Sequence, residues 1–258
     1  MPYFDDSSDG GTSDSSASDS SIGDAGASDY PSDSSDGGTN GSSDGGSSDG
    51  SSTSSATSSS SNGGSSDGST GAASSSSSAV NYSAMVAIPA GINAGLTDPS
   101  NDVMQNALGN PGTPDPGCGP SSAAMQKLIK TANVGPFRVT GLIPAVDALT
   151  RVFSAVQTAK PDLYAVLGSS GMLCVRFVRG STTSLSNHSW GTAIDINISG
   201  VLTPRGSTTV QQGLVDLCPF MHDEQFFWGA GFSPTPDGMH FEVSAELLAQ
   251  WKSDGTLP

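Results

Sequence analysis

The sequence has 258 residues, of which 25 are acidic and nine are Lys or Arg, and its formal net charge is −16. This charge is uneven, because all nine bases lie at or after Lys127 and twelve of the acids lie in the first 80 positions. The rest of the chain is only mildly acidic and has no basic aromatic patch, which argues against nucleic acid as a partner. No run of 18 apolar residues occurs, so no membrane span is expected.

Residues 1–80 consist mainly of Ser, Gly, Asp and Thr. Such a segment has too little apolar area to offset the entropy of ordering it, so we predict a disordered, solvated tether. Its Ser-Asp-Gly units lack the fixed spacing and the closing Glu of a calcium loop. The first residues show neither the basic nor the apolar region of a signal peptide.

Residues 81–258 are enough for one domain with its own core, which we expect to be monomeric. Residues 81–120 are rich in Pro, Gly and Asn and predict an irregular segment wrapped on a core of residues 121–258. The three cysteines permit at most one internal disulfide. We expect Cys174 to be a buried small apolar residue and not a reactive thiol.

The apolar periodicity predicts several helices and strands in the core. Helices are expected at 121–132, 144–159, 208–218 and 244–252, and strands at 137–142, 163–167, 172–178, 192–197 and 239–243. In the helix 144–159, Val146, Leu149, Val152, Phe153 and Val156 share one face. Because helices come mainly first and strands later, we predict an α+β domain with one mainly antiparallel sheet flanked by helices.

The stretch "SNHSWGTAIDIN", residues 186–197, contains one of the three histidines of the chain. If 192–197 is a strand, Ile194 and Ile196 face the core while Asp195 faces the other way. Gly191 would allow the preceding loop to fold His188 over the same face as Asp195.

The stretch "PDGMHFEV", residues 236–243, alternates in the same way. Met239, Phe241 and Val243 are expected to face the core, and His240 and Glu242 the opposite side. If the two strands pair, His188, Asp195 and His240 converge, and two imidazoles with one carboxylate form a typical ligand set of catalytic zinc.

Two further residues have the chemistry that a hydrolytic metal site needs. Asp237, three residues before His240, is placed to act as a general base. Arg176 lies in the apolar stretch "LCVRFVRG" and needs an anionic partner, such as a developing oxyanion or a substrate carboxylate. Arg179, at the end of the same stretch, is expected to be solvated.

These residues resemble a known family. "SNHSWGTAID" fits the pattern S-x-H-x-x-G-x-A-x-D and "DGMHFE" fits D-x-x-H-F-E, which are signatures of the D-alanyl-D-alanine carboxypeptidase (VanY-like) zinc metallopeptidases. The resemblance covers about residues 164–243. "FFWGAGF" at 226–232 resembles the W-G-G segment of the family, with Ala230 in place of the second glycine.

The resemblance implies a fold shared with lysostaphin-type peptidases and the Hedgehog signalling domain. It also implies zinc bound by His188, Asp195 and His240, with Asp237 as the catalytic acid or base. Arg176, or Arg179 if the register differs, would stabilise the transition state. Members cleave peptidoglycan stem peptides, either removing a terminal D-Ala or cutting the L-Ala-D-Glu bond, which predicts an extracellular or cell-envelope location.

Other polar and aromatic residues have more than one interpretation. Ser186 is expected to orient the loop or the ligands; Trp190 and Trp228 either line a substrate groove or belong to the core. Glu242 either orients His240 from behind or forms a surface salt bridge, and His222 is interpreted as a solvated helix end.

The alternative to a peptidase is a non-catalytic, metal-containing module that binds the cell wall or acts at the surface. The carboxylate of Asp237 favours the peptidase, because a purely structural zinc site has no need of it.

Overall fold

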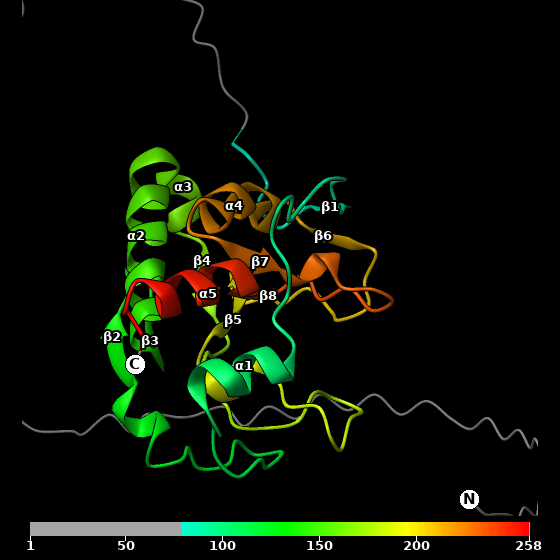
Figure 1. Ribbon diagram of the computed structural model, residues 1–258. Helices are drawn as coiled ribbons and strands as arrows, with labels where there is room; N and C mark the ends of the chain where they lie inside the picture. The colour runs from blue at the N-terminus through cyan, green and yellow to red at the C-terminus, as the bar shows by residue number, and fades with distance from the viewer. Residues whose placement is uncertain (1–78, 258) are drawn as a thin grey trace, which may run out of the picture. The chain divides into compact units, whose positions relative to one another are not determined.

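The computed structural model describes residues 79–257. The predicted tether, residues 1–80, lies outside the described residues except for Ala79 and Val80. The described part is an α+β fold with several helices and three small antiparallel sheets, as Figure 1 shows. The predicted fold class is confirmed at this level, but the expectation of one sheet is wrong.

The largest sheet has four antiparallel strands in the order β4-β5-β8-β7. They are β4 (Leu167–Ser169), β5 (Ala193–Ile198), β8 (His240–Val243) and β7 (Phe226–Trp228). Along β5 and β8, Ile194, Ile196, Phe241 and Val243 are completely buried. These alternate with the polar residues Asp195, His240 and Glu242, so one face of the sheet belongs to the apolar core and the other carries the polar groups.

Helices supply the rest of the apolar core. The helix α4 (Gln212–Asp223) packs against β7 and β5, and α2 (Ile143–Ala159) and α3 (Pro161–Tyr164) pack against α4. The chain ends in α5 (Ala245–Ser253). None of the helices between residues 79 and 257 has the length and apolar character required to cross a bilayer.

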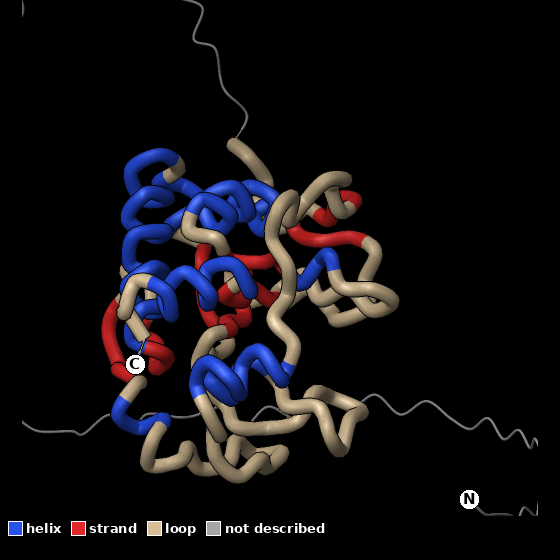
Figure 2. Tube along the Cα trace, viewed as in Figure 1, coloured by secondary structure: helices blue, strands red, loops and turns tan. Residues whose placement is uncertain are grey.

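Two smaller sheets lie outside the central one. The strand β2 (Ile129–Asn133) pairs with β3 (Arg138–Leu142), and β1 (Met85–Ala87) pairs with β6 (Thr209–Gln211). The remaining elements are α1 (Asn101–Leu108) and the short 3-10 turns η1 (Met125–Lys127), η2 (Asn187–Trp190) and η3 (Gly229–Gly231). Long loops join them (Figure 2).

Several predicted elements are confirmed with small shifts in their bounds. The helix predicted at 144–159 is α2, which has Pro144 in its first turn and buries all five residues of the predicted apolar face. The helix predicted at 244–252 is α5, and its N-cap Ser244 accepts a hydrogen bond from the Leu247 N–H. The helix expected at 208–218 begins later, because Thr209–Gln211 pairs with β1. Strands 137–142, 192–197 and 239–243 correspond to β3, β5 and β8.

Four predictions are wrong. The helix expected at 121–132 stops after one turn, because Ile129–Asn133 forms a hairpin with β3, closed by a turn at Gly135. In the strand expected at 163–167, the first two residues end helix α3, which starts at Pro161, the next two form a turn, and only Leu167 belongs to a strand, β4. The segment 172–178 forms only isolated bridges, at Val175 and Phe177. The wrap is not wholly irregular, because it contains β1 and α1.

A disulfide joins Cys118 to Cys174, with their Cα atoms 4.7 Å apart. The N–H groups of Asp115 and Gly119 both donate to the Val175 carbonyl, at 3.0 and 2.9 Å, and so bring the two cysteines together. The expectation that Cys174 is an unbonded apolar residue is therefore wrong. Cys218 remains a free thiol, and burial raises its pKa to about 11.

Candidate metal centre

Two paired strands and one turn bring His188, Asp195 and His240 to one point. In the ladder between β5 and β8, Asp195 lies directly opposite His240, so their side chains are on the same face. His188 comes from η2, just before β5. Gly191 ends that turn with a φ of 64°, and a Cβ there would lie 2.8 Å from the Cα of Gly141. Glycine is thus required both for the left-handed conformation and for the close approach to β3.

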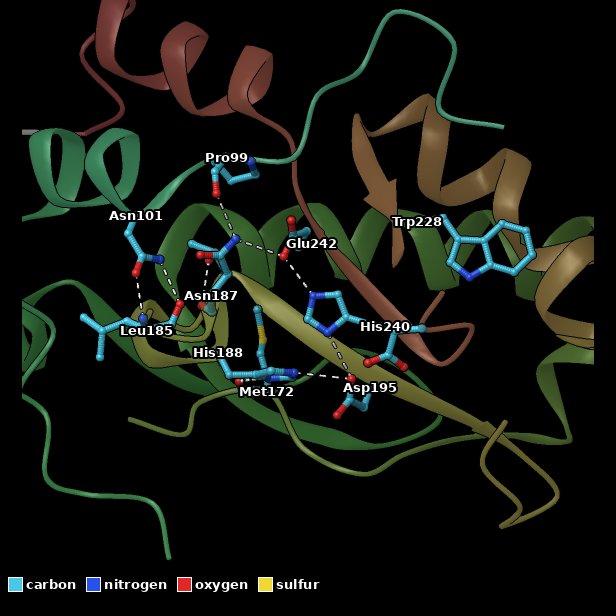
Figure 3. A network of polar contacts seen from close by, with 12 residues as sticks. Pro99, Asn101, Met172, Leu185, Asn187, His188, Asp195, Trp228, His240 and Glu242 are labelled. Atoms are coloured by element: carbon cyan, nitrogen blue, oxygen red, sulfur yellow. Dashed lines mark hydrogen bonds and ion pairs between the residues drawn. The ribbon is translucent and has the colours of Figure 1, made fainter. Parts of the chain in front are cut away.

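The donor atoms of the three side chains lie within 4.8 Å of one another. Asp195 Oδ1 is 3.3 Å from His188 Nε2 and 3.2 Å from His240 Nδ1 (Figure 3). The other nitrogen of each ring is already used: His188 Nδ1 donates to the Met172 carbonyl at 2.7 Å, and His240 Nε2 donates to Glu242 Oε2 at 2.8 Å. Each imidazole is therefore oriented by its first nitrogen and turns its second nitrogen, the one free to bind a metal, toward Asp195.

This donor set fits zinc. In a tetrahedral site with bonds of about 2.0–2.1 Å, neighbouring ligand atoms are about 3.3 Å apart, close to the two distances that join Asp195 to the histidines. Two nitrogens and one carboxylate oxygen also leave a fourth position for solvent or substrate, as in catalytic zinc sites. His188, Asp195 and His240 are the residues that would hold the ion.

The charges around the cluster favour a cation. Burial alone would raise the pKa of the Asp195 carboxyl, but His188 and His240 together hold it well below its ordinary range. For His240, burial alone would lower the pKa, whereas the hydrogen bonds to Asp195 and Glu242 raise it to about 10. The site therefore stabilises positive charge between two carboxylates.

Asp237 lies beside the cluster but is separate from it. Its N–H donates to the Gly229 carbonyl at 2.8 Å, and a Cβ on Gly229 would lie 2.8 Å from the Asp237 carbonyl oxygen, so the two segments pack closely. Oδ1 is buried and has no hydrogen bond within residues 79–257, while Oδ2 is 3.7 Å from Arg205 Nε. Burial raises the pKa of this carboxyl, and Asp195 adds to the rise against the opposing charges of His240 and Arg205. A carboxylate with a raised pKa and a free oxygen suits proton transfer.

Glu242 lies behind His240 and is almost fully buried, with 2% of its surface exposed. Its Oε2 accepts hydrogen bonds from His240 and, at 3.0 Å, from Asn187 Nδ2. Asn187 Nδ2 also donates to the Pro99 carbonyl at 3.2 Å. Glu242 thus orients His240 from behind, and within residues 79–257 it forms no salt bridge at the surface.

The cluster opens into a cavity of about 710 Å³. Its walls include the predicted residues Ser186, Arg176, Arg179 and Asp237. Arg176 does not extend from a strand; its Nη1 donates to the Phe177 carbonyl at 3.2 Å and its N–H donates to Ser189 Oγ at 3.1 Å. Both candidate arginines line the same cavity, and Arg179 is exposed there, as predicted.

Comparison with known proteins gives one match. Residues 179–243 match the family model described as D-alanyl-D-alanine carboxypeptidase. That segment is similar to this family. The family predicted from the two motifs is confirmed, and the match includes His188, Asp195, Asp237 and His240 but begins three residues after Arg176. Searches of curated proteins and of solved structures returned no significant match.

Trp190 and Trp228, for which a substrate groove was one alternative, both belong to the apolar core. Trp190 is fully buried, and its Nε1 donates to the Gly109 carbonyl at 2.8 Å. Trp228 is also fully buried, stacks on Phe241 with ring centres 5.5 Å apart, and donates to the Gly238 carbonyl at 2.7 Å. A groove role is therefore wrong for both, although Trp228 supports the loop between Asp237 and His240.

Two residues at predicted positions lie away from the reacting groups. His222 lies in the last turn of α4, where Nε2 is 3.2 Å from the Ala94 carbonyl, and is not part of the cluster. Ala230, which replaces the second glycine of the W-G-G segment, is buried in η3, whereas its neighbour Gly231 lines the cavity.

Three parts of the site were missed in the sequence. Asn187 occupies a variable position of the first motif, and only the structure reveals its contact with Glu242. The wall made by residues 98–101 comes from the wrap, far from both motifs in the chain. Arg205 could have been singled out from the sequence, because it is the only Lys or Arg between the two motifs.

Proposed function

We propose that the protein is a zinc-dependent peptidase that hydrolyses peptidoglycan stem peptides, of the D-Ala-D-Ala carboxypeptidase or the L-Ala-D-Glu endopeptidase type. The observation that carries this proposal is the combination of a zinc-compatible cluster with a separate carboxylate, Asp237, whose buried Oδ1 has no partner within residues 79–257. The family match supports a peptidase and a peptide substrate.

When bound, zinc would supply Lewis acidity toward water and toward the carbonyl oxygen of the scissile amide. Asp237 would accept the proton of the attacking water at Oδ1 and pass it to the amine that leaves. Arg176 would donate from its guanidinium to the oxygen that becomes negative in the transition state. Glu242 would keep His240 oriented by accepting its Nε2–H.

We also propose that the fold is the one shared with lysostaphin-type peptidases and the Hedgehog domain, because an antiparallel sheet carries the motif residues. An extracellular or cell-envelope location would agree with this substrate. The disulfide between Cys118 and Cys174 supports that location, because disulfides persist mainly in oxidising compartments.

The test is incubation of the purified full chain, loaded with zinc, with peptidoglycan fragments, followed by mass spectrometry of the products. Loss of a terminal D-Ala identifies a carboxypeptidase, and a new peptide that begins at D-Glu identifies an endopeptidase. A chelator should abolish the product, and added zinc should restore it. Binding of wall material without any product would overturn the peptidase in favour of the wall-binding module.

A further inference from the structure

Arg205 lies on the wall of the cavity, in the connection between β5 and β6, and belongs to neither motif. Its backbone is fixed against the loop that carries Asp237. The N–H of Gly206 donates to the Pro236 carbonyl at 2.6 Å, and the N–H of Ser207 donates to the Pro204 carbonyl at 3.1 Å. Arg205 is therefore held next to the proposed acid or base by backbone contacts and does not depend on its own side chain for its position.

The N–H donors of the Arg205 guanidinium are not used in hydrogen bonds within residues 79–257. Its nearest polar contact in the described part of the chain is Asp237 Oδ2, at 3.7 Å from Nε, which is longer than a hydrogen bond. Of the Arg205 side-chain surface, 36% is exposed. In contrast, Arg176 on the same cavity already donates to a backbone carbonyl.

A guanidinium presents its N–H groups as a planar fork that matches the two oxygens of a carboxylate. Four carboxylates line the cavity. Asp195 contacts the histidines, Glu242 contacts His240 and Asn187, Asp237 Oδ2 is 3.7 Å from Arg205 Nε, and no contact joins Asp98 to Arg205 within residues 79–257. The guanidinium of Arg205 can therefore donate hydrogen bonds to an anion from outside the chain while it stays beside Asp237.

We propose that Arg205 binds a carboxylate of the peptide substrate. This inference rests on the proposed peptidase function. Because Arg205 lies 3.7 Å from Asp237, which would act on the scissile amide, the carboxylate would lie within about one or two residues of that bond, given about 3.3–3.6 Å per extended residue. It would come either from the C-terminus of the peptide or from an acidic residue beside the cut.

Pairs of peptides that differ only in this charge separate the two sources. One pair carries a C-terminal carboxylate or its amide, and the other carries D-Glu or D-Gln after the scissile bond. The zinc-loaded full chain is compared with R205Q, with R205K, and with R138Q. Arg138 is exposed on β3 and outside the cavity, so R138Q makes the same change in net charge elsewhere.

For the pair that contains the recognised carboxylate, we expect R205Q to lower kcat/KM for the acid by about 10- to 100-fold, mainly through KM. The matching amide should change by less than about threefold, R205K should recover part of the loss, and R138Q should behave as the wild type. Zinc content and circular dichroism should be unchanged in R205Q. Equal losses on acid and amide, carried by kcat, would overturn the proposal, because they would mean that Arg205 acts only on Asp237.

A binding measurement separates this proposal from the peptidase function. N-acetyl-D-alanine and N-acetyl-D-glutamate, each with its uncharged amide counterpart, are titrated into the zinc-loaded chain and followed by NMR. If no peptide is hydrolysed but R205Q weakens binding of one carboxylate by at least about tenfold, the subsite stands and the peptidase function fails. If peptides are hydrolysed while R205Q binds both carboxylates as the wild type does, the subsite fails alone.

Discussion

Three carboxylates meet at the candidate site, and their surroundings give each a different chemistry. Asp195 lies between two imidazoles that keep it ionised, as a metal ligand must be. Glu242 accepts hydrogen bonds from His240 and Asn187 and so fixes a ligand instead of binding the ion. Asp237 has a raised pKa and an oxygen without a partner in the described chain, which suits proton transfer.

These differences predict opposite behaviour for two isosteric variants. D237N should lower kcat by about 10²- to 10⁴-fold while the chain still takes up one zinc ion, because only the proton-transfer group is lost. D195N should lose the zinc itself, because a neutral amide replaces the charged ligand between His188 and His240. Product formation and elemental analysis, measured on the same preparations, check both expectations.

Asp223→Asn is the matched control for these variants, since Asp223 is exposed at the end of α4 and lies outside the cavity. It should retain both zinc and activity. A D237N chain that hydrolyses peptides at the wild-type rate would remove Asp237 from the mechanism.

At the scale of elements, the sequence predicts best those segments whose local pattern and tertiary environment agree. The helix α2 has a five-residue apolar face and a proline in its first turn, and all five residues are buried. The two motif strands alternate strictly, so the shared face of Asp195 and His240 follows from the chain alone. The metal cluster could therefore be predicted from two short motifs.

The errors occur where long-range contacts override local pattern. In the helix expected at 121–132, Ser122 does cap the first turn, because its Oγ accepts a hydrogen bond from the Met125 N–H. The helix does not continue, because Ile129–Asn133 pairs with β3 in a hairpin. The segment 172–178 has the apolar content of a strand, yet it pairs only at isolated positions and is held by the disulfide. Contacts of this kind join residues far apart in sequence and leave no periodic signal.

Two asparagines attach the N-terminal wrap to the central sheet and the site. Asn93 donates to the Trp228 carbonyl at 2.9 Å and accepts from the Trp228 N–H at 2.7 Å. Asn101 makes the same pair of bonds with Leu185, at 2.8 and 2.6 Å. The Asn101 pair holds the segment that leads into Asn187 and His188 (Figure 3), whereas the Asn93 pair holds the end of β7.

Loss of Asn93 and loss of Asn101 should therefore differ in their effect on zinc affinity. Both N93A and N101A should lower the free energy of unfolding by about 1–3 kcal/mol, since each removes two hydrogen bonds to partly buried backbone groups. Only N101A should also weaken zinc affinity, by roughly tenfold, because Leu185 precedes the ligand segment. Competition with a chromogenic chelator measures the affinity, and the same loss in N93A would contradict this division.

At the scale of the whole molecule, zinc would join parts of the chain that are far apart in sequence. His188 comes from η2, Asp195 from β5 and His240 from β8, and Pro99 contacts the same network from the wrap. These groups come together only in the folded state. Binding of the ion would therefore contribute directly to the free energy of folding.

Removal of zinc should accordingly lower the thermal stability of the full chain. At a free zinc concentration about 1,000 times Kd, the ion stabilises the folded state by about 4 kcal/mol. For a folded unit of this size, that corresponds to a rise in Tm of roughly 8–16 °C, measured by circular dichroism in zinc and in chelator without reductant. The rise should grow with the logarithm of the zinc concentration and should be absent in D195N.

Magnesium at the same concentration should have little effect, because it prefers six oxygen ligands to imidazole. A Tm that is the same in zinc and in chelator would show that the folded chain does not bind the ion.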